Sequence, residues 1–111
     1  MRNSFWKPSL LSCVAAGLAF AYSDTWTGKL IDAACKVPAS PNELPKSCDA
    51  TPATSRFAVI TQEGKVYKFD AEGNVKTATA MRGFPDATGP MVKVTGLMDG
   101  DVLKVEAVEI R

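Results

Sequence analysis

The sequence has 111 residues and contains no histidine. Histidine is the side chain that most often orients a nucleophile or transfers a proton near neutral pH, so serine or cysteine triads of the usual type are excluded. A carboxylate pair is the remaining possibility, but Asp99 and Asp101 flank Gly100 and are typical of a solvated turn. We therefore predict that the protein is not an enzyme and that it has no catalytic residues.

The sequence also lacks a run or stripe of basic residues. It has 13 Lys and Arg against 12 Asp and Glu, which gives a formal net charge of +1. Proteins that bind nucleic acid depend on a positive electrostatic footprint. We therefore expect no nucleic-acid partner.

A long apolar run is missing as well. The apolar stretch from Leu10 to Phe20 is shorter than the roughly 20 residues that a membrane-spanning helix needs. It follows the basic residues Arg2 and Lys7 and ends with the small residues around Ala21, as a secretory signal peptide does. The alternative is a buried core helix, but no polar face alternates with the apolar one.

We predict that residues 1–21 are a signal peptide cleaved after Ala21 and that residues 22–111 form a single periplasmic or secreted domain with no stable membrane span. Cleavage removes two basic residues and leaves a net charge near −1. Lipidation at Cys13, as in bacterial lipoproteins, ranks below simple cleavage because the residues before it fit that pattern only in part.

Cysteine is scarce: the predicted domain keeps two of the three, Cys35 and Cys48. An even number of cysteines in an exported protein favours a disulfide. This one would close a loop of about 14 residues within the proline-rich segment 33–55. For a loop of this length, the chain-entropy model predicts that the disulfide stabilises the folded state by about 3 kcal/mol. The alternative is an envelope thiol-redox or metal-handling protein that uses these two cysteines. Exchange catalysts, however, typically carry Cys-x-x-Cys.

We expect no metal and no cofactor, because two cysteines offer too few soft ligands. Methionine sulfur is also a soft ligand, but we predict that Met81, Met91 and Met98 fill the core instead.

Periodicity predicts the secondary structure. Apolar residues alternate with polar ones in four segments. We predict single strands at 25–31, 56–61 and 65–70, and a two-stranded hairpin at 91–111. Asp99-Gly100 favours the hairpin turn, and the alternation slips near Ala107, as at a β-bulge. Val75 to Arg82 is predicted as a short helix with Asn74 as its N-cap, and with Val75, Ala78 and Met81 on one side.

Five strands with one helix between the third and fourth predict a mainly β fold, a small five-stranded OB-fold-like Greek-key barrel. Gly28 inside the first strand marks a bend or a close backbone approach. The alternatives are an open five-stranded meander or an SH3-like barrel.

The motifs Trp26-Thr-Gly28 and Asp32-Ala-Ala-Cys35, followed by the segments 64–69 and 92–101, resemble small exported bacterial OB-fold domains of unknown function, of the periplasmic kind. This resemblance spans most of the predicted domain. It implies a fold and a compartment, and it does not imply an activity.

OB-folds bind ligands on one barrel face and through the loops around it. The candidate ligand-binding residues are Arg56, Tyr67, Lys68, Arg82 and Phe84. The alternative is that the two aromatic residues are partly buried in the barrel and the basic residues are ordinary surface. The predicted function is a non-enzymatic module that binds an envelope protein, a glycan or a small ligand.

Overall fold

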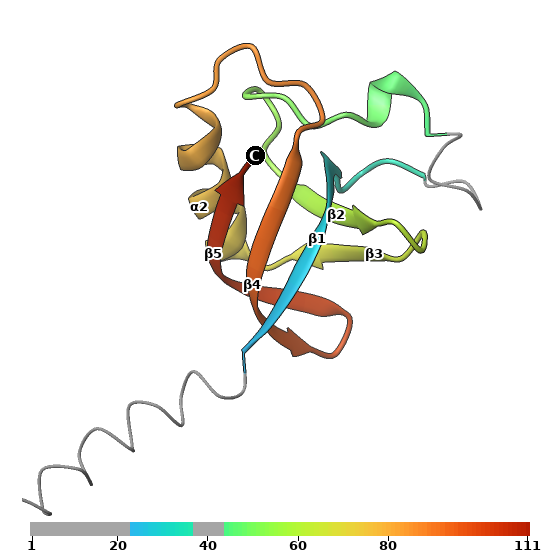
Figure 1. The fold of residues 1–111 in the computed structure, drawn as a ribbon, viewed down its shortest axis with the longest axis vertical. Coiled ribbons are helices and arrows are strands. Elements are labelled where there is room, and N and C mark those ends of the chain that lie inside the picture. Colours follow the sequence, from blue (N-terminus) through green and yellow to red (C-terminus); the bar gives the residue numbers. More distant parts are fainter. Residues whose placement is uncertain (1–22, 37–43) are drawn as a thin grey trace, which may run out of the picture.

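The computed structural model describes residues 23–36 and 44–111 (Figure 1). The predicted signal peptide 1–21, with Cys13 and the cleavage site after Ala21, lies outside the described residues.

The described part of the chain is mainly β structure. The strands are β1 (Asp24–Asp32), β2 (Phe57–Thr61), β3 (Val66–Phe69), β4 (Met91–Asp99) and β5 (Val102–Ile110); the helix α2 (Ala71–Met81) lies between β3 and β4, and a short 3-10 helix, η2 (Lys46–Cys48), precedes β2. The predicted strands are therefore confirmed, with ends that differ by one or a few residues.

The five strands form a closed barrel in the order β1-β2-β3-β5-β4, with β4 pairing back onto β1. All neighbours are antiparallel except β3 and β5, which run parallel through the pairs Lys68–Val102 and Phe69–Leu103. Closure removes the open sheet edges that a meander would leave. The predicted class, a mainly β five-stranded barrel with one short helix, is confirmed.

Gly28 is the point where β1 changes partners. It pairs with Thr61 of β2 and also with Val92 of β4, so two strands converge on one residue. A Cβ atom at this position would overlap the Ile60 carbonyl oxygen and contact the Val59 side chain. The predicted close backbone approach is confirmed, and it lets β1 bend into the barrel.

The predicted β-bulge is also present. Thr95 pairs with Ala107 but the next residue, Gly96, pairs with Val105, so Glu106 is the extra residue in β5. A bulge bends its strand and increases the local twist. The part of β5 before the bulge pairs with both β3 and β4, and the part after it pairs with β4.

The core fills the interior of this barrel. Its buried members are Leu30, Ala50, Phe57, Val59, Phe69, Met81, Val92, Val94, Leu103 and Val105. Helix α2 packs mainly on β5 and contributes Met81, which is fully buried. Met91 and Met98, by contrast, are 50% and 40% exposed, so the prediction that they fill the core was wrong. Met91 lies on the outer face of β4, and Met98 lies beside the β4–β5 turn.

The predicted start of the helix was also wrong. The helix begins at Ala71, and the N-cap is Asp70, whose Oδ1 accepts a hydrogen bond from Gly73 N at 2.9 Å. The same oxygen accepts from Val105 N at 3.2 Å, which ties the helix start to β5. The buried face of the helix consists of Gly73, Thr77 and Met81, so Val75 lies on another side and is 67% exposed rather than packed.

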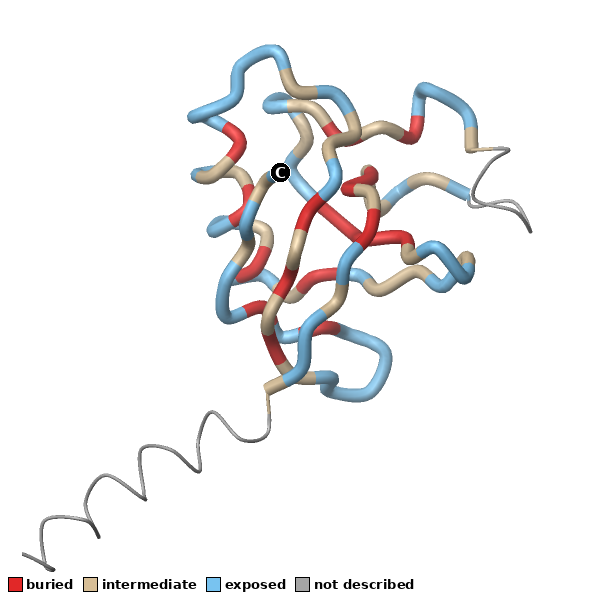
Figure 2. The backbone as a smooth tube through the Cα atoms, in the orientation of Figure 1, coloured by how far each residue is buried: buried red, intermediate tan, exposed pale blue. Residues whose placement is uncertain are grey.

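A second buried cluster lies on the outer face of the barrel. Ile31, Ala58 and Ile60 alternate with core residues along β1 and β2, yet they are buried too. As a result β2 is buried at four successive residues (Figure 2). Leu44 packs against this cluster, so the tethered loop serves as its cover.

Candidate functional site

The disulfide fixes the covering loop against β1. Cys35 and Cys48 are bonded, with their Cα atoms 5.3 Å apart, and Cys48 is 3% exposed. The chain then follows β1: Ile31 forms an isolated bridge with Asp49, and Lys29 Nζ lies 2.7 Å from Asp49 Oδ1. Ala33 and Leu44, which lie close in sequence to the two bonded cysteines, pack against the buried residues Ile31, Ala58 and Ile60.

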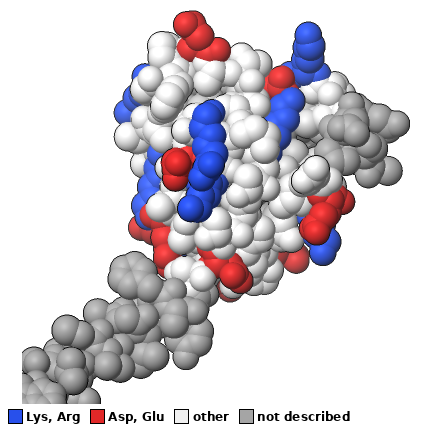
Figure 3. Space-filling model, in the orientation of Figure 1, with Lys and Arg blue, Asp and Glu red and all other residues white. Residues whose placement is uncertain are grey.

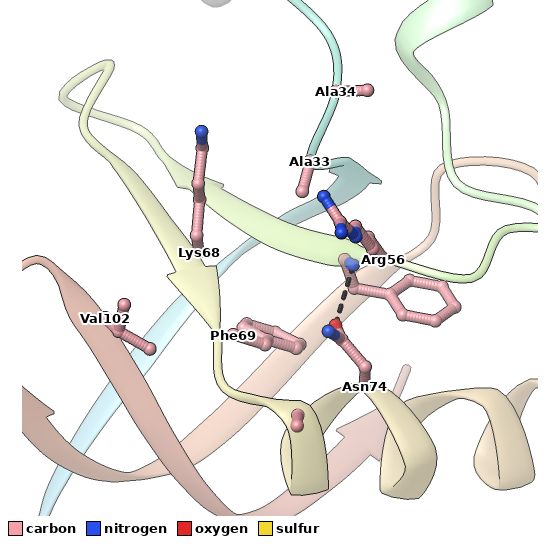
Figure 4. Close-up of a pocket in the computed structure, with 9 residues that line it drawn as sticks. Ala33, Ala34, Arg56, Lys68, Phe69, Asn74 and Val102 are labelled. Atoms are coloured by element: carbon pink, nitrogen blue, oxygen red, sulfur yellow. Dashed lines mark hydrogen bonds between the residues drawn. The ribbon is translucent and has the colours of Figure 1, made fainter.

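A pocket of about 440 Å³ opens where four elements meet: the start of β2, the end of β3, the start of β5 and the first turns of α2 (Figure 4). Its lining residues are Ala33, Ala34, Arg56, Phe57, Lys68, Phe69, Ala71, Asn74 and Val102. Ala33 and Ala34 come from the loop after β1, so the loop that carries Cys35 forms one wall. The barrel closure at β3 and β5 therefore creates this pocket.

Strand pairing brings the two basic residues of the pocket onto one face. Lys68 pairs with Ala58 across the β2–β3 hairpin, and Arg56 precedes Ala58 by two positions. Residues two apart in an extended chain point to the same side. Both side chains are exposed and stand around the same opening (Figure 4).

Neither cation has an acidic partner within the described residues. The ion pairs found there are Lys29–Asp49 and Glu109–Arg111. The lining residues include no carboxylate. Elsewhere, on the face of the molecule seen in Figure 3, acidic and basic side chains are interspersed. The pocket mouth is therefore a local concentration of positive charge on a protein whose overall charge is close to neutral.

Asn74 is the third polar side chain of the pocket. Its Oδ1 accepts a hydrogen bond from Phe57 N at 2.9 Å (Figure 4). This contact fixes the orientation of the amide and leaves its NH₂ group as the available donor. Within the described residues that NH₂ group has no hydrogen-bond acceptor. Asn74 was predicted as a helix cap, and this placement shows a different role for it.

The floor and walls of the pocket are apolar. Phe57 is fully buried and Phe69 is 6% exposed, so the two rings lie beneath the pocket and offer little accessible surface to it. Val102 is 38% exposed and supplies the wall on the β5 side. The site therefore combines donors at its mouth with hydrocarbon below.

The structure brings together Arg56 and Lys68 among the five candidate ligand-binding residues. Tyr67 lies on the opposite face of β3 and packs against Trp26, with ring centroids 5.8 Å apart. Arg82 and Phe84 follow the C-terminal end of α2 and do not line the pocket. Phe84 is 48% exposed, so it is not a barrel aromatic.

The sequence reasoning missed seven of the nine lining residues: Ala33, Ala34, Phe57, Phe69, Ala71, Asn74 and Val102. They come from separate elements that only the folded barrel brings together, and this leaves no local pattern in the sequence. Arg56 and Lys68 were found because they were predicted to lie on the ligand-binding face of an OB-fold.

Comparison of the chain with protein-family models, with curated proteins and with solved structures gives no match.

In the part of the chain that the structure describes, no group of three or more Cys, Asp or Glu side chains is arranged to hold a metal ion. No helix in those same residues is long and apolar enough to cross a membrane.

Proposed function

We propose that this protein is an exported, non-enzymatic OB-fold module that binds a small ligand or an envelope partner in the pocket between Arg56 and Lys68. The single observation that carries the proposal is this pocket, in which two cations stand beside an apolar surface and neither has an ionic partner among residues 23–36 and 44–111. Unpaired charges beside a concave apolar surface are typical of binding sites.

The position of the pocket supports the proposal. OB-folds bind ligands on the face of their second and third strands and through the loops after the first and fourth strands. The pocket takes Phe57 from β2 and Lys68 from β3, Arg56 from the residue just before β2, Ala33 from the loop after β1, and Val102 from the strand that follows the β4–β5 turn. Its lining thus draws on the elements that such a module uses.

The disulfide supports the proposed location. Disulfides form and persist in oxidising compartments, such as the periplasm and the extracellular space. The pairing of Cys35 with Cys48 fits a domain that has been exported after removal of the signal peptide 1–21.

The alternative, a thiol-redox or metal-handling protein, has less support. A disulfide that takes part in exchange has an accessible sulfur with a lowered thiol pKa. Here Cys48 is buried and Cys35 is half-buried, and the nearby residues Ala33 and Leu44 pack on the buried cluster that contains Ile31 and Ile60. A covering role accounts for these features.

A pair of tryptophan variants tests the binding function. Val102→Trp places a large side chain in the wall of the pocket, whereas Val75→Trp makes the same change on the exposed side of α2, outside the lining. We expect backbone amide signals of Ala34, Lys68 and Asn74 to shift when ¹⁵N-labelled protein is titrated with fractions of an envelope extract. The Val102→Trp variant should lose the shifts and Val75→Trp should keep them. Shifts that persist in Val102→Trp contradict the proposal.

A further inference from the structure

The available donors of the pocket define the chemical class of its ligand. The Arg56 guanidinium has five N–H donors in a planar fork and the Lys68 ammonium has three. The oriented NH₂ group of Asn74 adds two more. None of these groups accepts a hydrogen bond. A ligand that matches them therefore presents oxygen acceptors, and two positive charges favour acceptors that are ionised.

Four carboxylates are adjacent in sequence to the lining residues, at Asp32, Asp70, Glu72 and Asp101, and none of them forms an ion pair with Arg56 or Lys68. Asp70 precedes the lining residue Ala71, but its Oδ1 accepts hydrogen bonds from the Gly73 and Val105 backbone amides. Asp32 lies before the other wall, and its Oδ1 accepts from Ala34 N at 2.9 Å. Both carboxylates hold the backbone that forms the pocket, and neither forms an ion pair with Arg56 or Lys68.

The pocket also limits the size of the ligand. A volume of about 440 Å³ is at the small end of the range for ligand sites. The accessible apolar surface of the lining is supplied by Val102 and by the alanines at 33, 34 and 71, because Phe57 and Phe69 are buried beneath it. A ligand that uses both parts has its charged head at the mouth and a short hydrocarbon end on the floor.

We infer that the pocket binds a small organic anion, with a carboxylate or phosphate head held by Arg56, Lys68 and the Asn74 amide, and with a tail of a few carbon atoms against Val102 and the alanines of the lining. This inference rests on the proposed binding function and adds the ligand class to it. Carboxylate and phosphate share the required chemistry, and they are separated by experiment.

The test is an NMR titration of the ¹⁵N-labelled full protein with four probes of similar length: valerate, butyl phosphate, 1-pentanol and pentylamine. We expect at least one of the two anions to shift the amide signals of Ala34, Lys68 and Asn74. The neutral and cationic probes should bind at least about tenfold more weakly, because they lack ionised acceptors. The ratio of the two anion affinities identifies the preferred head group.

Charge variants complete the test. Arg56→Ala and Lys68→Ala should each weaken anion binding by about tenfold or more, as expected for loss of a charged hydrogen bond. Arg56→Lys should restore part of the affinity, since it keeps the charge and loses the fork. The matched control is Lys65→Ala, which removes an exposed lysine from the β2–β3 turn, outside the lining, and should leave the affinity unchanged.

Several results overturn the inference. Equal binding of 1-pentanol, or unchanged anion affinity in both alanine variants, contradicts the ligand class but leaves a binding pocket in place. Absence of pocket shifts with every probe at millimolar concentration also contradicts it. The proposed binding function is judged separately, by the titration with envelope fractions and the Val102→Trp variant.

Discussion

At the residue scale, Gly28 lies so close to the backbone of β2 that a side chain does not fit there. A Cβ atom there would overlap the Ile60 carbonyl oxygen, and a backbone atom of a central strand cannot move aside easily. We expect Gly28→Ala to lower the free energy of unfolding by about 2–4 kcal/mol, as overpacking in a core does. Urea denaturation measures this change.

The matched control for that variant is Gly83→Ala. A Cβ atom at Gly83 meets only the Ala80 carbonyl oxygen, at an ordinary contact distance of 3.5 Å. Its effect should stay within about 0.5 kcal/mol. Equal stability losses in the two variants contradict the assignment of Gly28 as the close-approach residue.

Asp70 is the second position where one side chain decides local structure. Its Oδ1 serves the amides of Gly73 and Val105, so Asp70→Ala removes the helix cap and a tie to β5 together. We expect a loss of about 1–2 kcal/mol in the free energy of unfolding. Asp86→Ala removes an exposed carboxylate from the loop after α2 and should be nearly neutral. A neutral Asp70→Ala contradicts the capping role.

At the element scale, helix α2 completes the core of the barrel through Met81. Met81→Ala should cost about 2–4 kcal/mol, because it leaves a cavity among fully buried neighbours. Met98→Ala makes the same change at a residue that is 40% exposed, near the β4–β5 turn, and should cost much less. Thermal unfolding of both variants gives the comparison. Similar losses in both mean that the helix does not close the core.

The disulfide-held loop is the other element whose contribution can be isolated. The double variant Cys35→Ala, Cys48→Ala should lower the free energy of unfolding by about 3 kcal/mol through greater freedom of the unfolded chain. Reduction of the unchanged protein with dithiothreitol should give a similar loss. A stable double variant with unchanged hydrogen exchange at Ile31 and Ala58 contradicts the covering role of the loop.

The element scale also shows what the sequence can predict. The alternation in Met91–Asp99 records which side chains enter the barrel, so strands could be assigned from it. The start of α2 could not, because Asp70 and Asn74 are both good N-caps. The choice between them depends on contacts with Val105 and Phe57, which are distant in sequence.

At the scale of the whole molecule, the fold class could be predicted and the site only in part. Arg56 directly precedes β2 and Lys68 lies in β3 of the same hairpin, so their proximity was predictable. That neither has an ionic partner among the described residues was not predictable, because it depends on where the acidic side chains lie in the folded chain. The walls from Ala33 and Val102 arise only when the barrel closes.

The most direct test of the whole account is native mass spectrometry of protein produced with its own N-terminal segment and recovered from the cell envelope. The account predicts a chain that starts at Tyr22, that is lighter by the two hydrogens lost in one disulfide, and that carries a small anionic ligand. This ligand should be missing from the Arg56→Ala, Lys68→Ala double variant. A chain with free thiols, a bound metal ion or a lipid at Cys13 contradicts the account.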